Sequence, residues 1–304
     1  MVVKTLRLLT WALALISRAQ LQSGEVEDVC EMIQIVLSIR DKILILDCLT
    51  ALRLLAENNK ISDLMIRNGL HIKVKDLVLM KDSCDLTTSS LQTLYAISGM
   101  DVGTVLDILF DQQLLERLEE IKNSQDSKDN YLYILHICSN VAEKCPEKWE
   151  MLVQSELFQN ALIDLKECNC SQIVLEASYF ILYTFENLDN DSHLKLDIVQ
   201  RMDILFEPMI AVLSEPKFDH NTMHPCLYML RSVLNFWVES GKFHFIESMR
   251  EIKGDEVIEN LLHSENTDLR NLAQEIYQEH FSYDIDDAMN EDAYNFEGNR
   301  SLDF

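Results

Sequence analysis

The sequence is poor in the two residues that most often break helices and form turns. It has 7 glycines and 4 prolines among 304 residues. Sheet-rich folds need such residues at their many turns, so their scarcity argues against a β-sandwich or β-barrel. Hydrophobic residues still make up 48% of the chain, which is enough for a substantial core. The composition therefore predicts an all-α fold.

Positive charge is also scarce. The chain has 26 Lys and Arg against 51 Asp and Glu, which gives a formal net charge of −25. Such a surface disfavours nucleic acid and anionic membrane as partners and favours basic proteins or peptides. No stretch reaches the roughly 20 uninterrupted apolar residues of a membrane span. We therefore expect no nucleic-acid partner and no membrane partner.

The cysteines lack the spacing of a metal site or of a disulfide framework. The eight cysteines are Cys30, Cys48, Cys84, Cys138, Cys145, Cys168, Cys170 and Cys226. None forms a CxxC pair, and most lie inside apolar runs. We interpret them as reduced core thiols of an intracellular protein.

Catalytic motifs are missing as well. No Gly-rich phosphate loop and no Ser, His and Asp group stands out. His220, His224 and Cys226 could suggest a metal site, but Pro225 follows His224 and no fourth ligand is suitably spaced, so we interpret them as part of a solvated loop. Cys168-Asn169-Cys170 is interpreted as a turn between helices. We expect no enzyme, no metal and no cofactor.

What the chain does contain is helical periodicity, most clearly near its C-terminal end. One apolar edge consists of Val257, Ile258, Leu261 and Leu262. After a polar turn at residues 264–268, a second face consists of Leu269, Leu272, Ala273, Ile276, Tyr277 and Phe281. Two such helices cannot bury their apolar faces alone, so similar pairs must stack against them.

The same pattern of short, medium and long helices recurs along the chain. The first helices are predicted from about Val26 to Ile39 and Ile43 to Glu57, and a short helix turns at Asn68-Gly69. Equivalent points in the long helices are Leu15, Arg53, Ala96, Asn140, Tyr183 and Ser232, which lie 38 to 49 residues apart. Armadillo and HEAT arrays have periods of about 40 to 47 residues, whereas an irregular bundle would keep no period.

The last repeat carries a resemblance. The segment VIENLLHSENTDLRNLAQEIYQEHF, followed by an acidic tail that contains phenylalanines, resembles the last armadillo repeat and C-terminus of the importin α family of nuclear-import adaptors. The resemblance implies a right-handed armadillo-repeat solenoid of three-helix units. Residues 1–22 would form the third helix of a partial repeat, residues 23–282 about six repeats, and residues 283–304 a disordered acidic tail.

The N-terminal stretch has two interpretations. MVVKTLRLLTWALALISRAQ has Lys4, an apolar run and a small residue near its end, as a secretory signal peptide does. However, Arg7 interrupts the run, and the segment also resembles the third helix of a middle importin α repeat. We favour the repeat helix over the signal peptide.

In importin α, the third helices line a groove in which a Trp and, one turn later, an Asn bind an extended basic peptide. The Trp positions read Trp11, Leu49, Gln92, His136, Tyr179 and Tyr228 here, and the Asn positions are the six residues used above for the spacing. Only Trp11 and Asn140 keep the family residue, and Glu176 matches a family Glu three residues before Tyr179. The predicted peptide-binding residues are Trp11, His136, Asn140, Glu176, Tyr179 and Tyr183.

The resemblance implies a transport adaptor in cytoplasm and nucleus. It would bind basic localisation signals of cargo proteins weakly and be recycled by an exportin together with Ran-GTP. The exportin-binding region would include Glu265, Asp268, Asp284, Asp286 and Asp287. Importin β is not expected to bind, because the family's basic N-terminal segment is absent, through either a truncated gene model or divergence. The alternative is an armadillo scaffold that has lost cargo binding and uses its acidic groove for another protein.

Overall fold

The computed structural model describes residues 23–39, 41–56, 62–81, 83–100, 103–124, 128–167, 170–188, 195, 206–215, 218–240 and 244–282. Within these ranges the regular structure is helical and contains no strand, which confirms the all-α prediction. The predicted N-terminal segment 1–22 and acidic tail 283–304 lie outside the described residues. The domain limits inferred from the sequence stay a prediction.

The chain divides into two compact units. The first unit comprises Met1–Asp164 and Tyr179–Asp189, and the second comprises Leu165–Ser178 and Asn190–Phe304. The helices of the first unit, two of which continue across the division, are α2 (Ser23–Leu37), α3 (Lys42–Ala56), α4 (Ser62–Arg67), α5 (Leu70–Leu79), α6 (Cys84–Ser98), α7 (Gly103–Leu109), α8 (Gln112–Lys122), α9 (Lys128–Lys144), η2 (Pro146–Lys148), α10 (Trp149–Val153), α11 (Glu156–Glu167) and α12 (Ser171–Asn187).

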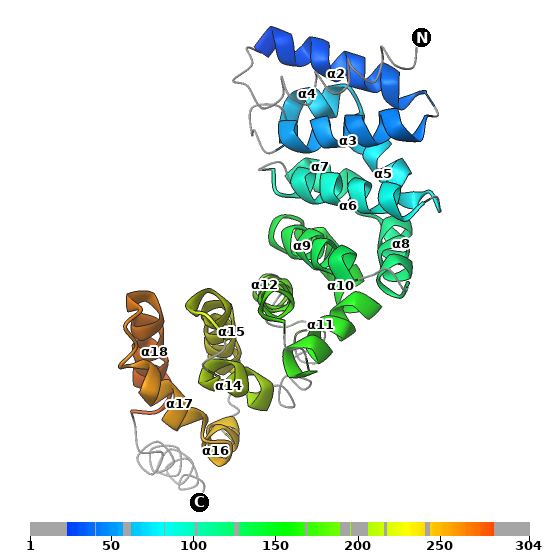
Figure 1. Ribbon diagram of the computed structural model, residues 1–304. Coiled ribbons are helices and arrows are strands. Elements are labelled where there is room, and N and C mark those ends of the chain that lie inside the picture. The colour runs from blue at the N-terminus through cyan, green and yellow to red at the C-terminus, as the bar shows by residue number, and fades with distance from the viewer. Residues whose placement is uncertain are drawn as a thin grey trace, which may run out of the picture. The chain divides into compact units, whose positions relative to one another are not determined.

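In the first unit, corresponding helices of successive repeats pack against one another. The long helices α3, α6 and α9 lie one against the next, and the shorter helices α5 and α8 contact each other beside them (Figure 1). Helix α2 packs mainly against α3 and also contacts α4 and α5. The short helices α4 and α7 each contact α5, and α7 also contacts α9. A unit of short, medium and long helix is thus repeated, as the sequence period predicts.

The second unit repeats this packing. Its helices are α14 (Phe206–Ser214), α15 (His220–Glu239), α16 (His244–Glu251), α17 (Gly254–Leu261) and α18 (Thr267–His280). The long helix α15 packs against α18, and the medium helix α14 packs against α17. The short helix that the sequence predicts over residues 194–200 lies outside the described residues except for Lys195.

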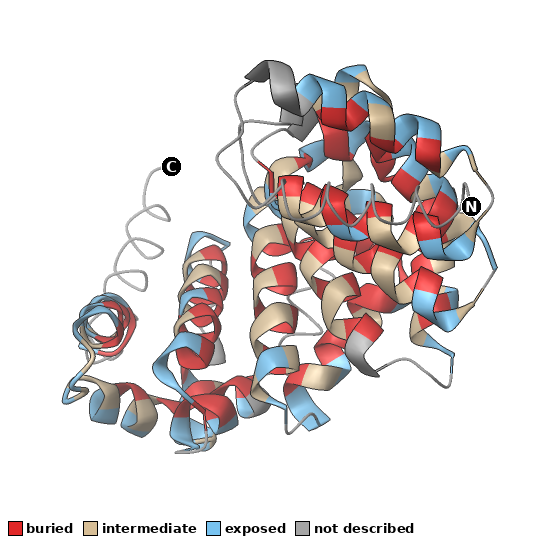
Figure 2. Ribbon diagram, turned by 45° about the horizontal axis from the view of Figure 1, so that its top comes forward, coloured by how far each residue is buried: buried red, intermediate tan, exposed pale blue. Residues whose placement is uncertain are grey.

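Local sequence explains why these helices form. In α8, Leu114, Leu118 and Ile121 recur on one face and are buried. Asp111 caps the helix, since its carboxylate accepts a hydrogen bond from the Leu114 N–H at 3.0 Å. Burial of a leucine side chain contributes about 1.5 to 3 kcal/mol, so such faces hold the stack together. Figure 2 shows buried residues on the helix faces that meet and exposed residues on the outward faces.

Helix α18 confirms the apolar face predicted for it, whereas on the preceding apolar edge Ile258 is buried and Val257, Leu261 and Leu262 are half-buried. Leu269, Leu272, Ala273 and Ile276 of α18 are buried, and Asn266 in the predicted polar turn caps the helix through the N–H groups of Asp268 and Leu269. Helix α16, in contrast, does not follow from the apolar pattern of the sequence. It is short, and Ile246 and Met249 are the buried apolar residues it supplies among those whose burial is described.

The cysteine interpretation is correct in part. Seven described cysteines carry free thiols, and five of them are buried. Burial raises the pKa of the Cys48 thiol to about 12. Cys84 and Cys170 are exposed, because each lies at the start of a long helix rather than on its apolar face. Cys168 lies outside the described residues.

Two turns between short and medium helices use the left-handed backbone region. Gly69 lies between α4 and α5 with φ of +63°, and Lys253 lies between α16 and α17 with φ of +61°. Glycine adopts this conformation without a Cβ clash, whereas other L-residues pay about 1 to 2 kcal/mol. Gly69 thus supplies the conformation that its turn requires.

Replacement of Gly69 by alanine should therefore destabilise the first unit by about 1 to 2 kcal/mol. An added Cβ would meet no atom within 4 Å, so the cost would come from the backbone alone. Gly99→Ala is the matched control, because Gly99 has φ of −71° and a Cβ there would make only ordinary contacts. Urea denaturation followed by circular dichroism measures both changes, and equal midpoints for the two variants would contradict the strain argument.

Candidate peptide-binding face on the third helices

The long helices of the first unit present one face whose residues are neither fully buried nor fully exposed. On this face lie Gln92 and Tyr95 of α6 and Tyr133, His136 and Asn140 of α9, all of them partly accessible to solvent. We call the surface formed by these residues with Arg53 of α3 the third-helix face. Partial burial holds such side chains in place while leaving them able to meet a ligand.

A chain of hydrogen bonds crosses the third-helix face. The guanidinium of Arg53 donates to Oε1 of Gln92 at 3.0 Å, and Nε2 of Gln92 donates to the Tyr133 hydroxyl at 3.1 Å. These two bonds connect α3, α6 and α9. The Nε atom of Arg53 is buried and donates to no described residue. The face therefore has a fixed polar spine with one positive charge.

Aromatic rings lie beside this spine. The Tyr95 and His136 rings meet edge to face with centroids 4.5 Å apart, and the Tyr95 and Tyr133 centroids are 5.9 Å apart. On α12, the rings of Tyr179 and Tyr183 stack with centroids 5.7 Å apart. Aromatic rings can pack against the stems of long side chains and attract cations to their faces. The predicted residues His136, Tyr179 and Tyr183 thus supply aromatic contact area.

Asn140, which is predicted to bind a peptide, forms a hydrogen bond within the protein. Its Nδ2 donates to the Ser98 hydroxyl on α6 at 2.8 Å, so part of its amide links two neighbouring long helices. One turn later, Lys144 donates to the backbone carbonyls of Ser98, Gly99 and Met100 at the end of α6. Sequence comparison can place an amide on the right face, but it does not show which partner the amide has.

Leu49 does not lie on the third-helix face. Its side chain is fully buried in the core, and its backbone carbonyl accepts a hydrogen bond from Thr93 at 3.1 Å. The alignment by spacing is therefore wrong at this position, because the close contact between α3 and α6 leaves no room for solvent there. Trp11 and Leu15 lie outside the described residues.

The remaining aligned positions are accessible. Glu176 is half-buried and lies one turn before Tyr179 on α12, as the sequence predicts. In the second unit, Tyr228 is exposed and Ser232 is half-buried on α15.

Acidic side chains gather away from the third-helix face. A pocket of about 480 Å³ lies between α8 and the segment formed by η2, α10 and α11. Its glutamates are Glu119, Glu147, Glu150 and Glu156. Much of the attraction that the chain exerts on basic molecules in the first unit therefore comes from another surface.

The predicted exportin-binding residues are described in part. Glu265 is exposed in the turn before α18, and Asp268 is exposed in the first turn of that helix. The neighbouring Asn266 supplies the helix cap, so the two carboxylates are left to face solvent. Asp284, Asp286 and Asp287 lie outside the described residues.

Polar contacts also hold α18 on α15. Arg231 forms ion pairs with Glu275 at 2.7 Å and Glu279 at 3.2 Å. His280 is buried, and its Nε2 donates to Oδ1 of Asn235 at 2.8 Å. Its Nδ1 is buried and has no partner among the described residues, so a second proton there would gain no hydrogen bond. Burial therefore lowers the pKa of His280, and the Arg231 charge lowers it further, whereas Glu279 raises it.

The interpretation of His220, His224 and Cys226 as a solvated loop is wrong. All three lie on α15, whose first turn is capped by Asp219 through the Thr222 N–H at 2.9 Å. Cys226 is fully buried against Ser178. Among the described residues, no group of three or more His, Cys, Asp or Glu could hold a metal ion. No helix in the described ranges is long and apolar enough to cross a membrane.

The lowered pKa of His280 predicts that acidification destabilises the second unit. Below about pH 6.5 the unfolded chain binds a proton that the folded chain resists, so stability is present above this pH and is lost as the pH falls toward the folded pKa. His280→Gln keeps a donor for Asn235 but cannot titrate. Urea midpoints at about pH 7.5 and about pH 5.5 should differ less for this variant than for the unchanged chain.

His263→Gln serves as the control, because His263 is exposed in the turn after α17. It should keep the pH dependence of the unchanged chain. An identical pH dependence in the His280→Gln variant would show that the buried ring does not titrate in this range.

No protein-family model and no curated protein sequence matches the chain. Solved structures do match it. A designed armadillo repeat protein has a TM-score of 0.63 at 15% identity, over 80% of this chain and 95% of that one. Another, in complex with the peptide (KR)4, has a TM-score of 0.62 at 13% identity, over 80% and 95% of the two chains.

Computationally designed armadillo repeat proteins for modular peptide recognition match with a TM-score of 0.64 at 13% identity, over 80% of this chain and 95% of that one. At such low identity the likeness shows the fold alone. It confirms the predicted fold class: the chain is an all-α solenoid of the armadillo type.

Proposed function

We propose that this chain is a protein-interaction scaffold that binds an extended peptide on the third-helix face. The observation that carries the proposal is the hydrogen-bonded spine of Arg53, Gln92 and Tyr133, which brings polar groups from three successive repeats to one surface. An extended peptide presents N–H and C=O groups at regular intervals, so regularly repeated polar side chains suit it. The armadillo fold and its designed relatives that bind peptides support this function.

The charge of the face determines which peptides fit. The spine contains one guanidinium and no carboxylate. A basic peptide therefore meets aromatic rings but no acidic partner on the spine. We propose that strongly basic peptides bind this face weakly, and that their residual attraction reflects the net charge of −25 and is screened by salt.

A random peptide library displayed on phage and selected on the intact chain tests the scaffold function. The selected peptides should bind the Gln92→Ala variant about two- to tenfold more weakly, because that range corresponds to one net hydrogen bond. Gln113→Ala is the matched control, since Gln113 is exposed on α8 away from the face. Fluorescence anisotropy measures the affinities, and circular dichroism checks that both variants are folded.

The peptide (KR)4 serves as the strongly basic comparison in this experiment. It should bind weakly, lose affinity as salt is raised, and respond little to Gln92→Ala. Selected peptides that bind both glutamine variants equally well would remove the third-helix face as the binding site.

A narrower proposal is that the scaffold serves nuclear transport. The resemblance to importin α motivates it. The exposed Glu265 and Asp268 at the start of α18 favour it, because acidic groups there could meet a basic surface of an exportin. In this proposal the chain moves between cytoplasm and nucleus and is recycled by the exportin with Ran-GTP. Its cargo would be proteins with basic localisation signals.

A pull-down with the exportin and Ran-GTP tests this narrower role. The intact chain should bind, and joint replacement Glu265→Lys with Asp268→Lys should reduce binding by reversing two charges. Glu247→Lys with Glu251→Lys, at exposed positions of α16, should leave binding unchanged. A complete lack of binding, or equal binding by all three proteins, would argue against recycling while leaving the peptide scaffold untouched.

A further inference from the structure

A small pocket lies on a different surface of the first unit, where α6 begins, α8 ends and α9 begins. It has a volume of about 180 Å³ and is lined by Cys84, Thr87, Arg117, Glu120, Ser124 and Asn130, among others. None of these residues belongs to the third-helix face. The volume is about six times the roughly 30 Å³ that one water molecule occupies in the liquid, so a group of several heavy atoms fits.

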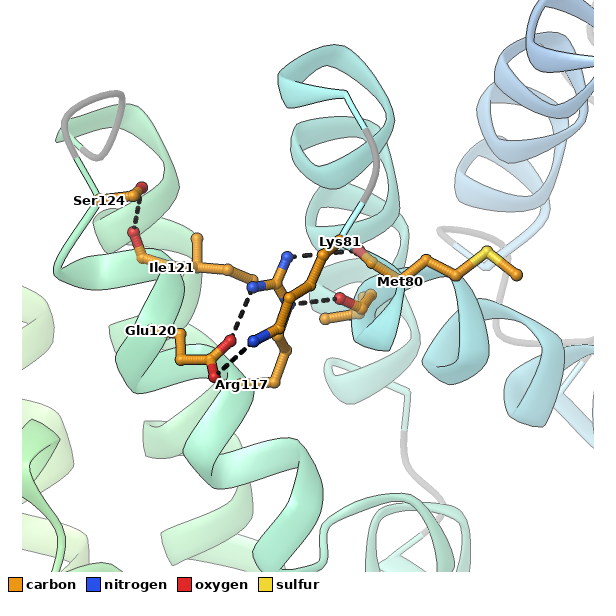
Figure 3. A network of polar contacts seen from close by, with 7 residues as sticks. Met80, Lys81, Arg117, Glu120, Ile121 and Ser124 are labelled. Atoms are coloured by element: carbon orange, nitrogen blue, oxygen red, sulfur yellow. Dashed lines mark hydrogen bonds and ion pairs between the residues drawn. The ribbon is translucent and has the colours of Figure 1, made fainter.

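The charged residues that line the pocket, Arg117 and Glu120, are held in place by several polar contacts. The guanidinium of Arg117 donates to the backbone carbonyls of Val78 at 3.1 Å and Met80 at 3.3 Å, where α5 ends. It also pairs with Glu120 at 2.9 Å, and Lys81 pairs with the other oxygen of Glu120 at 2.9 Å (Figure 3). The carboxylate and the two cations thus already have partners, and the wall has little need of a charged ligand.

Asn130, which also lines the pocket, has an unsatisfied hydrogen-bonding group. Asn130 is 3% exposed, and its Oδ1 is buried without a hydrogen-bond partner among the described residues. A buried amide without a partner typically costs about 1 to 3 kcal/mol, and native proteins seldom tolerate it unless something else supplies the bond. The Ser83 hydroxyl at the start of α6 is also buried and unpaired within the described ranges. The unsatisfied amide at the pocket points to a ligand that completes it.

We propose that this pocket binds a primary carboxamide beside the Cys84 thiol. A primary carboxamide has both N–H donors and a carbonyl acceptor, so it can pair with the amide of Asn130 in either orientation of that amide. An ammonium group would meet the charge of Arg117 and a carboxylate that of Glu120, while the attracting charge in each case is already paired within the wall. The neutral amide avoids both repulsions.

The alkylation rate of the Cys84 thiol reports whether a carboxamide binds in this pocket. Cys84 is exposed, it lines the pocket, and it is the first residue of α6. Iodoacetamide is itself a primary carboxamide with a reactive carbon. In the reaction the sulfur forms a C–S bond to the methylene carbon, the C–I bond breaks, iodide leaves with the electron pair, and the thiol proton passes to water. Cys170, the other exposed described cysteine, serves as an internal reference.

Alkylation rates of Cys84 and Cys170 in the intact folded chain, followed by peptide mass spectrometry, test the proposal. The Cys84 to Cys170 rate ratio should be about two- to tenfold higher with iodoacetamide than with its N,N-dimethyl analogue, which keeps the carbonyl and the leaving group but has no N–H donor. In the Asn130→Leu variant, checked for folding by circular dichroism, this preference should disappear.

Equal ratios for the two reagents would overturn the proposal, and so would a preference that survives Asn130→Leu. Two competitors identify the source of the natural ligand by the protection of Cys84 that they give. Protection by free propionamide assigns the pocket to small carboxamides. Protection only by a short peptide containing glutamine assigns it to a glutamine side chain of a partner protein.

Discussion

Each three-helix unit has apolar faces that it cannot cover alone, and the rest of the structure depends on this constraint. Helix α6 shows it directly, because Leu91, Leu94 and Ile97 are buried and the helix contacts α3 on one side and α9 on the other. Each buried leucine contributes about 1.5 to 3 kcal/mol. A unit without neighbours would lose much of that stabilisation, so the sequence must repeat in order to fold.

Stacking then determines which polar groups can meet. Thr93 on α6 donates to the carbonyl of Leu49 on α3, and Lys75 on α5 pairs with Asp111 before α8 at 2.5 Å. Such partners lie one repeat apart in sequence, and only a regular stack brings them together. Partly exposed pairs add little stability, so their main effect is to favour one register between units.

The helices could be predicted where the apolar periodicity is strong, as in α8 and α18, and the polar turn at residues 264–268 also marks the start of α18. Elements with only one such signal are harder to predict. Helix α16 is short and has few buried apolar residues, and the segment around His220 resembles a loop unless Asp219 is taken as a helix cap. Positions on the third-helix face followed from spacing, except at Leu49, where helix packing rather than spacing decides exposure. The hydrogen bond from Asn140 to Ser98 depends on a contact between neighbouring repeats, which no local pattern contains.

On the third-helix face, most of the Trp and Asn positions of importin α hold other residues, and this changes where the energy of peptide binding comes from. Gln92 and Asn140 form hydrogen bonds to neighbouring repeats, so a peptide must either use their remaining donors and acceptors or replace those bonds. Replacement exchanges one hydrogen bond for another and gains little, whereas a peptide group that pairs with a donor or acceptor left over on Gln92 gains up to the usual value of about 0.5 to 1.5 kcal/mol. The rest of the binding energy on this face must come from apolar contact with the rings of Tyr95, Tyr133 and His136, which favours peptides chosen for their side chains rather than for positive charge.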